Sequence, residues 1–424
     1  MIDDILRSNE LDITDSVCDL TSIFKDIKIL SKGGASSTIQ LIAKISDAQK
    51  TYDIFNRYVE ETGKDGVFIK IGFDEKNDNS IDMEKTIYKY LLTLLLNNRT
   101  PNIMRFVAGF RCNNFFDFVM EEHKKDTKNK YYDELKNKLL KLSLDSDADL
   151  HKAIISVIEL GEGMDFDELL EKNTVSYVDF LKIMFQILYT LRQLYLNKVK
   201  HNDIHIKNVW INILGRPKRL IYFIDDDRYA IIETRYVVKL YDFDLSTFTI
   251  GPLSNTKLIE FCPEFGVCSN DNERFDILVV MYTLYSFHGS DYKYRYINDF
   301  VRKIIDGKYL VGSEYKFPGR YCKKKLKDGK IVKPVVCEPD GVIDSEEVYN
   351  ILQLCTETDV FDTFLYSLQK NGFKRSDLPL TTSGNGEPIL DIPLFDFKTN
   401  VYVSSDCTQT PLMLATNLEH LAKE

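Results

Sequence analysis

The sequence has no long apolar run, no closely spaced pair of cysteines and no excess of basic residues. Its 424 residues include 8 cysteines, and no two of them form a Cys-x-x-Cys pair. Cysteines scattered in this way predict neither a zinc site nor a disulfide framework, and they favour reduced thiols in a cytosolic compartment. Lys and Arg number 55 against 65 Asp and Glu, which gives a net charge of −10. This balance argues against non-specific binding of nucleic acid.

Segments that would enter a membrane are also missing. The longest apolar run, Ile154 to Leu160, is far shorter than the roughly 20 residues that span a bilayer. The first residues, Met1 to Arg7, carry acidic side chains and no apolar core, so they do not resemble a secretory signal. We therefore predict no membrane span.

What is present is an ordinary globular composition, with 44% hydrophobic and 28% charged residues. Short β-type segments occupy the first part of the chain, and longer segments with helical periodicity follow. Strands are expected at 27–30, 40–45, 66–72, 102–111 and 154–161, a hairpin turn at 225–228, and helices at 81–96, 124–149, 177–197, 275–287 and 348–368. Residues after about 292 are otherwise weakly patterned. Strands followed by helices predict an α+β fold with a small β-rich lobe and a larger helical lobe.

One segment carries the residue types that phosphoryl transfer requires. It runs from His201 to Asn208, after a predicted helix and before a predicted strand, and Asp242 ends a later strand. Phosphoryl transfer needs a carboxylate that orients the attacking hydroxyl and hard oxygen ligands for magnesium. Asp203 is the candidate for the first role, and Asn208 and Asp242 are the candidate metal ligands. The spacing, the flanking elements and the second motif together argue against coincidence.

Residues 27–290 resemble the eukaryotic-type protein kinases, whose landmarks occur here in the family's order. Lys70 resembles the strand lysine that holds the α- and β-phosphates of ATP, and Glu84 resembles its ion-pair partner on the next helix. The segment around Glu159 and Gly161 is similar to the kinase hinge, and the resemblance implies that backbone groups of these two residues meet adenine.

Two other segments bear on nucleotide binding. Residues 118–122 are a second candidate for the hinge, which we rank below Glu159 because an acidic helix start and a long helix follow Glu159 directly. The phosphate loop has glycine at Gly33 and Gly34 and serine at Ser37, where the family has its third glycine. Small residues still let backbone amides approach phosphates.

The remaining landmarks include departures from the family pattern. Cys262-Pro-Glu264 is similar to the Ala-Pro-Glu that closes the activation segment, and Asp276 resembles the aspartate that anchors the catalytic loop. The arginine that usually precedes the catalytic aspartate is Asn202, which makes activation by a phosphate less expected. The lysine that the family has two residues after the catalytic aspartate is replaced by His205, whose imidazole would contact a γ-phosphate. The glycine of Asp-Phe-Gly is Asp244, which restricts the backbone.

With these departures, the sequence is more similar to the divergent kinases of large DNA viruses, including the poxvirus virion kinase group, than to cellular kinases. The resemblance implies a bilobal kinase-like fold and a serine/threonine protein kinase that uses ATP and Mg²⁺, with Mn²⁺ as the alternative metal. It implies protein substrates and a location in host cytoplasm or virion. The expected divisions are a leader at 1–26, an N-lobe at 27–160 with insertions at about 46–65 and 111–150, and a helical C-lobe at 161–424 with an extension from about 292.

Two alternatives stay open at this point. A pseudokinase or structural virion protein would keep the fold without the activity, which the sparse phosphate loop and Asp244 would suit. A small-molecule phosphotransferase of the aminoglycoside or choline kinase type shares the His-x-Asp motif, but such enzymes lack Cys262-Pro-Glu264 and its segment. The sequence gives no indication of oligomeric state.

Overall fold

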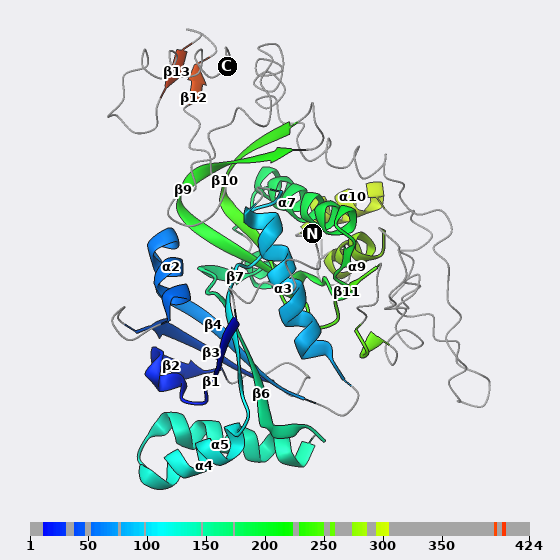
Figure 1. Cartoon of the computed structure of the whole chain (residues 1–424). Coiled ribbons are helices and arrows are strands. Elements are labelled where there is room, and N and C mark those ends of the chain that lie inside the picture. Colours follow the sequence, from blue (N-terminus) through cyan, green and yellow to red (C-terminus); the bar gives the residue numbers. More distant parts are fainter. Residues whose placement is uncertain are drawn as a thin grey trace, which may run out of the picture.

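The computed structural model describes residues 12–30, 38–46, 52–74, 78–96, 99–145, 147–172, 174–223, 229–249, 255–258, 274–285 and 294–304, and two short strands at 394–396 and 401–403. Within these ranges the chain combines a largely antiparallel sheet, smaller sheets and several helices (Figure 1). The α+β class predicted from the sequence is confirmed at this level. None of the helices in these ranges is long and apolar enough to span a bilayer.

The larger sheet has six strands in the order β1-β5-β6-β4-β3-β2. They are β1 (Asp12–Ser16), β2 (Phe24–Ile29), β3 (Thr38–Ile45), β4 (Gly66–Asp74), β5 (Phe106–Cys112) and β6 (Asp149–Glu159). All neighbours pair antiparallel except β1, which runs parallel to β5. Lys70 of β4 lies opposite Gln40 of β3 and Ser156 of β6, so the predicted strand lysine is in the interior of the sheet.

Alternation of side chains along the three middle strands separates the two faces of this sheet. One face belongs to a hydrophobic core and includes Leu41, Ala43, Val67, Ile69, Ile71, Ile155 and Val157. The alternate residues line a cavity on the other face: Gln40, Ile42, Phe68, Lys70, Ser156 and Ile158. Each fully buried aliphatic side chain contributes roughly 1.5–3 kcal/mol, and a shift of register by one residue would expose this whole set. The core therefore fixes Lys70 on the cavity face.

Helices pack into two separate cores. The core of the larger sheet includes residues of α2 (Asp53–Thr62), α4 (Phe115–Lys125) and α5 (Lys130–Asp145). A second core contains α3 (Ser80–Leu96), α6 (Phe166–Glu171), α7 (Tyr177–Leu196), α9 (Arg274–Leu284) and α10 (Arg295–Ile304). Figure 1 shows α3 beside α7, away from the pair α4 and α5. The helix that carries Glu84 is thus packed with the helices of the second core.

Two of the smaller sheets contain the strands that flank the predicted catalytic segment. β7 (Gly163–Asp165), β9 (Val209–Phe223) and β10 (Tyr229–Leu240) form one antiparallel sheet in the order β10-β9-β7. β8 (Val199–Lys200) pairs with β11 (Thr247–Phe248), and β12 (Leu394–Asp396) pairs with β13 (Val401–Val403). Two single turns of 3₁₀ helix complete the described elements, η2 (Leu20–Ser22) and η3 (Ile206–Asn208).

Helix α7 positions the segment that follows it. Ser176 caps its first turn, because the Ser176 side chain accepts a hydrogen bond from the Asp179 backbone N–H at 3.1 Å and donates one to its carboxylate at 2.7 Å. The helix ends at Leu196, as the sequence predicts within one residue. Lys198 then adopts a left-handed φ of 61°, which turns the chain into β8 and the segment that begins at His201.

Several elements differ from the sequence prediction. Residues 53–62 form α2 inside the insertion expected at about 46–65, and 115–145 form two helices where one helix is expected at 124–149. Helix α10 occupies 295–304, in the part predicted to be weakly patterned, and β1 and the start of β2 lie within the predicted leader. The hairpin turn at 225–228 and the helix at 348–368 lie outside the described residues.

Cys18 and Cys112 form a disulfide, so the prediction that the cysteines are unpaired is wrong for these two. They are 94 residues apart in sequence, and their Cα atoms are 5.0 Å apart. The parallel pairing of β1 with β5 brings them together, and the Val17 backbone N–H donates to the Arg111 carbonyl at 2.9 Å. Spacing along the chain gave no signal, since the contact depends on the sheet.

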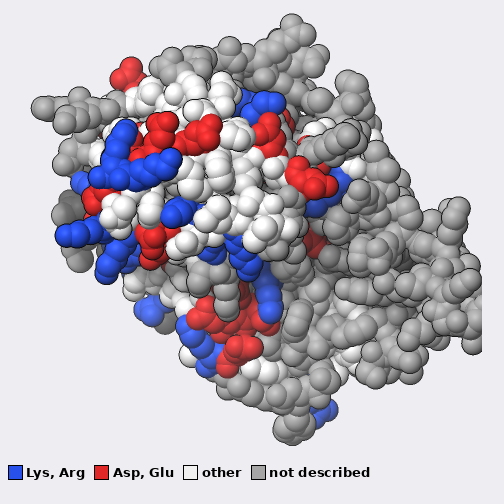
Figure 2. Space-filling model, turned by 90° about the horizontal axis from the view of Figure 1, so that it is seen from below, with Lys and Arg blue, Asp and Glu red and all other residues white. Residues whose placement is uncertain are grey.

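The end of the molecule formed by α4 and α5 carries charges of both signs (Figure 2). Neighbouring ion pairs account for part of this mixture, including Lys125 with Glu122 at 2.6 Å and Lys152 with Asp149 at 3.3 Å. Figure 2 shows no continuous basic stripe among the described residues of this face. This face therefore differs from the basic surfaces that bind nucleic-acid backbones.

Candidate functional site

A cavity of about 230 Å³ lies on the face of the larger sheet that carries Lys70. Its lining combines apolar and aromatic side chains with a few charged groups: Gln40, Ile42, Phe68, Lys70, Glu84, Tyr88, Met104, Ser156, Ile158, Glu159, Leu160, Gly161, Trp210, Tyr241 and Asp242. Concave, mainly apolar sites with a few convergent polar groups are typical of small-molecule binding. Five residues predicted to act in catalysis or binding are among these: Lys70, Glu84, Glu159, Gly161 and Asp242.

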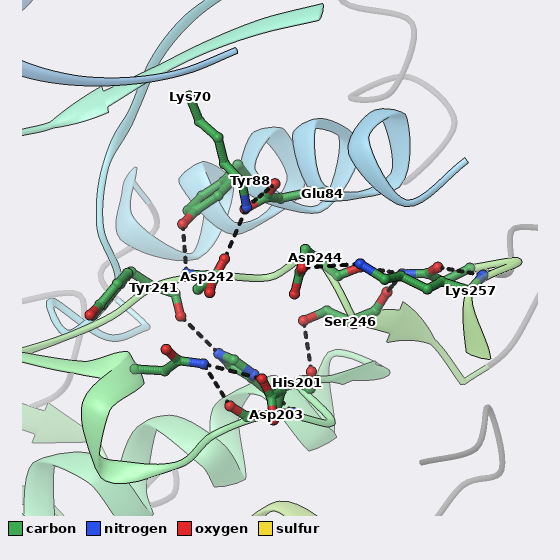
Figure 3. A network of polar contacts seen from close by, with 12 residues as sticks. Lys70, Glu84, Tyr88, His201, Asp203, Tyr241, Asp242, Asp244, Ser246 and Lys257 are labelled. Carbon is green, nitrogen blue, oxygen red and sulfur yellow. Dashed lines mark hydrogen bonds and ion pairs between the residues drawn. The ribbon is translucent and has the colours of Figure 1, made fainter. Parts of the chain in front are cut away.

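Lys70 is the centre of the charged group (Figure 3). Its Nζ lies 2.9 Å and 3.0 Å from the two carboxylate oxygens of Glu84, and 2.9 Å from Oδ1 of Asp242. Glu84 comes from α3, and Asp242 directly follows β10, 172 residues after Lys70. The predicted pair of Lys70 and Glu84 is therefore in contact. Asp242 completes a three-membered group that links the sheet, α3 and the segment after β10.

The charges of this group shift one another's protonation. Burial alone would lower the pKa of Lys70, but the carboxylates of Asp242 and Glu84 raise it well above its ordinary value. Burial raises the pKa of Glu84 to about 7, against the attraction of Lys70. Burial also opposes ionisation of Asp242, yet Lys70 holds the pKa of Asp242 below its ordinary value.

Asp244 adds a third carboxyl group to the same region. Burial and then the charge of Asp242 raise the pKa of Asp244, and Lys257 Nζ lies 3.4 Å from its Oδ2. Three carboxyl groups therefore share the ammonium groups of Lys70 and Lys257. A site with more carboxyl than ammonium groups attracts cations.

The segment that begins at His201 is held by Asp276 of α9. The two carboxylate oxygens of Asp276 accept hydrogen bonds from the backbone N–H groups of His201 and Asn202, both at 2.8 Å. This is the anchoring contact implied by the kinase resemblance. Asn202 and Asp242 adopt left-handed φ angles of 68° and 65°, and such backbone strain concentrates at functional sites.

His201 connects this segment to the residue before Asp242. Its Nδ1 accepts from the Asp203 backbone N–H at 3.3 Å, so Nε2 carries the proton and donates to the Tyr241 carbonyl at 3.1 Å. His201 is fully buried. Its ring therefore sets the distance between the backbones that carry Asp203 and Asp242.

Asp203 and Asn208 are joined within one turn. Nδ2 of Asn208 donates to the backbone carbonyl of Asp203 at 2.8 Å and lies 3.5 Å from its Oδ2. Because the amide nitrogen is used in this way, Oδ1 of Asn208 is the atom left to ligate a cation. His205 Nε2 is 3.7 Å from Oδ2 of Asp203. The structure thus brings the predicted catalytic residues Asp203 and His205 next to the predicted ligand Asn208.

The donor set fits magnesium bound together with phosphate oxygens. In the described part of the chain, no group of three or more His, Cys, Asp or Glu side chains is arranged to hold a metal by itself. Mg²⁺ commonly takes one or two protein carboxylates and completes its shell with phosphate oxygens and water. The Asp242 side chain is 33% exposed, whereas that of Glu84 is 3% exposed. Asp242 and Asn208 are therefore the ligands that suit this site, and Glu84 holds Lys70.

Glu159 lines the cavity, but its carboxylate is bound to other groups of the protein. Its carboxylate is buried, 2.9 Å from Lys239 Nζ, and accepts from the Arg105 backbone N–H at 3.0 Å. Its own N–H donates to the Arg105 carbonyl at 2.9 Å. The Glu159 side chain thus binds Lys239 and the Arg105 backbone, so it serves to hold this end of the cavity in place.

Gly161 is next to the indole of Trp210. A Cβ at position 161 would lie 2.2 Å from Trp210 Nε1, so the ring requires glycine here. Nε1 is buried and has no hydrogen-bond partner in the described ranges. The second candidate for the hinge, 118–122, is inside α4 and does not line the cavity, so this candidate is wrong.

Some predicted site residues lie outside the described ranges, namely Gly33, Gly34, Ser37 and Cys262-Pro-Glu264. Other residues of the site were not predicted. The Tyr88 hydroxyl accepts from the Asp242 backbone N–H at 3.1 Å, and Tyr88 follows Glu84 by one helical turn, which is a usable signal. Trp210 is the second residue of β9, and nothing in the sequence pattern indicates that it lines the cavity.

No family model matches the sequence, and no curated protein matches it. The roles of these residues therefore rest on their geometry and chemistry.

Proposed function

We propose that the chain is an ATP- and Mg²⁺-dependent serine/threonine protein kinase with a bilobal kinase-like fold. We further propose that it belongs with the divergent kinases of large DNA viruses, similar to the poxvirus virion kinase group. The main support is the contact of Lys70 with both Glu84 and Asp242. Residues of three separate elements meet there, beside the segment that holds Asp203 and Asn208.

Each residue has a role that its contacts support. Lys70, kept charged by its carboxylate partners, would hold phosphate oxygens. Asp242 and Asn208 would ligate the magnesium ion, which when bound neutralises charge on the phosphates. Asp203 would orient the hydroxyl of the substrate and accept its proton. Glu84 fixes the lysine through two contacts of about 3 Å.

The apolar part of the cavity suits a planar base. Ile42, Phe68, Met104 and Trp210 form walls that a purine could contact. The Glu159 carbonyl and the Gly161 backbone are at the same end of the site. This arrangement supports ATP as the phosphoryl donor.

The compartment also forms part of the proposal. A protein kinase of this group would act in host cytoplasm or in the virion. The Cys18–Cys112 disulfide favours the virion, because cytosolic thiols are kept reduced.

Transfer of the γ-phosphate from ATP to a mixture of basic proteins tests the function. Asp203→Asn and Asp242→Asn should each reduce transfer at least about 100-fold, since each removes a group that acts on the reacting atoms. Asp299→Asn is the matched control, because Asp299 is exposed on α10 and pairs only at 3.9 Å with Arg295.

Three results would contradict the proposal. The first is equal transfer by both variants and wild type. The second is ATP turnover that sugars, choline or aminoglycosides stimulate far above proteins, which would indicate a small-molecule phosphotransferase. The third is a wild-type protein that neither binds Mg-ATP nor transfers phosphate, which would indicate a structural role.

A further inference from the structure

A triple hydrogen bond joins the start of α3 to a distant segment. The backbone N–H of Asn79 donates to Thr256 Oγ1 at 2.9 Å, and the backbone N–H of Thr256 donates to Asn79 Oδ1 at 2.8 Å. The Thr256 hydroxyl also donates to Asn79 Oδ1 at 2.9 Å. The two residues are 177 positions apart. Asn79 caps α3, since its carbonyl accepts from the Met83 N–H at 2.8 Å.

The neighbours of Thr256 bind the segment after Asp242. Nδ2 of Asn255 donates to the carbonyls of Asp244 and Ser246, at 2.6 Å and 3.1 Å. Lys257 pairs with the Asp244 carboxylate at 3.4 Å. Figure 3 shows Asp244, Ser246 and Lys257 on one side of Asp242. Residues 255–257 thus contact both the start of α3 and the segment that carries the candidate metal ligand.

These contacts close a ring around the site. One path runs from α3 through Glu84 and Lys70 to Asp242, with contacts of 2.9–3.0 Å. The other runs from the first residue before α3 through Thr256 and its neighbours to Asp244. α3 also contacts the larger sheet, through Asp82 with Arg111 of β5 and through Tyr88 with Phe106. The contact with Thr256 adds a link from the start of α3 to the segment after Asp242, which the sheet does not provide.

We propose that Thr256 is a positioning residue, which through Asn79 holds the first turns of α3 and so keeps Glu84 in contact with Lys70. This inference rests on the proposed kinase function for its effect on turnover. The contact needs no phosphate, since its groups are a hydroxyl, an amide and backbone N–H groups. Ser246 and Thr247 nearby are fully buried, so the fold as it stands orders this region without a modification there.

The test uses substitutions that separate the hydroxyl from the shape of the side chain. Thr256→Val removes both hydrogen bonds of the hydroxyl and keeps the volume, and Thr256→Ser keeps the hydroxyl. Thr283→Val is the matched control, because within the described residues the Thr283 hydroxyl donates to the Val280 carbonyl of its own helix, at 3.1 Å. Two quantities are measured on the full chain: hydrogen exchange of peptides from 80–96, and kcat and KM for ATP in γ-phosphate transfer.

We expect Thr256→Val to speed exchange in the first turns of α3 by about tenfold, as the loss of one or two hydrogen bonds implies. Its kcat should fall several-fold with a smaller change in KM, because Glu84 acts through Lys70 on the transferred group. Thr256→Ser and Thr283→Val should behave like wild type in both measurements.

Unchanged exchange of α3 in Thr256→Val would overturn the positioning role, and so would a Thr256→Ser protein as impaired as the valine variant. The exchange measurement needs no activity. If wild type transfers no phosphate, the kinase proposal fails while exchange still decides the role of Thr256.

Discussion

At the scale of single residues, the site is surrounded by charges that are buried as pairs. Lys239 and Glu159 lie behind the cavity, and their side chains are 1% and 5% exposed. Lys70 and Glu84 form a comparable pair at its centre. Burying either charge alone would be very unfavourable, so each partner is required by the other. Such pairs define one arrangement of the strands and helices that carry them.

We expect Glu159→Gln to lower the free energy of unfolding by about 3–5 kcal/mol at neutral pH, because the buried Lys239 would lose the carboxylate that lies 2.9 Å from its Nζ. Chemical denaturation measures this change. Glu168→Gln is the control, with an expected loss below about 1 kcal/mol, since Glu168 pairs with Lys172 in solvent.

The same pair gives a pH dependence with a defined sign. Burial opposes ionisation of Glu159, but Lys239 holds the pKa of Glu159 below its ordinary value in the folded protein. A pKa lowered by folding stabilises the protein above the ordinary carboxyl pKa, and this stabilisation is lost as the pH falls through the folded value. The difference between wild type and Glu159→Gln should therefore shrink on acidification. A difference that stays constant from neutral to acidic pH would show that the pair is not ionised as described.

At the scale of elements, one end of β1 and one end of α3 are each linked to a residue far away in the sequence. β1 is at the edge of the larger sheet and pairs only with β5. The disulfide between Cys18 and Cys112 fixes the chain just after β1 to the last residue of β5. The contact of Asn79 with Thr256 links the start of α3 in a similar way.

Reduction of the disulfide should lower the free energy of unfolding by about 2–4 kcal/mol, because the bond closes a long loop in the unfolded chain. Denaturation with and without a reductant measures the effect, and peptide mapping under non-reducing conditions identifies the bond. Cys18→Ser should match the reduced wild type and should not respond to the reductant. Equal stability of wild type with and without reductant would mean that the bond does not form.

At the scale of the whole molecule, the sequence predicts the elements that follow a regular pattern. The strand expected at 66–72, which carries Lys70, is present as β4, and helical periodicity placed α3 and α7 within one or two residues. The expected anchoring of the His201 segment by Asp276 is also present. In each case the signal is local, or it depends on the order of motifs along the chain.

Contacts between distant residues of common types could not be predicted in this way. The pairs Asn79–Thr256, Cys18–Cys112 and Glu159–Lys239 consist of residues that occur in many loops and strands. Only the assembled sheet and helices bring them together. Helix α10 is a different case, because its spacing of Ile297, Phe300 and Val301 is helical and such a pattern is readable in the sequence.

The melting temperature with and without Mg-ATP tests the central claim most directly. A ligand that binds only the folded protein stabilises it by about 2.7 kcal/mol at a concentration 100-fold above its dissociation constant. The kinase proposal predicts that Mg-ATP raises the melting temperature of wild type and of Asp299→Asn. It predicts no rise when EDTA removes the magnesium, or in Asp242→Asn, which lacks the carboxylate proposed to bind the metal. A rise that is the same with EDTA and in Asp242→Asn, or no rise in wild type, would contradict it.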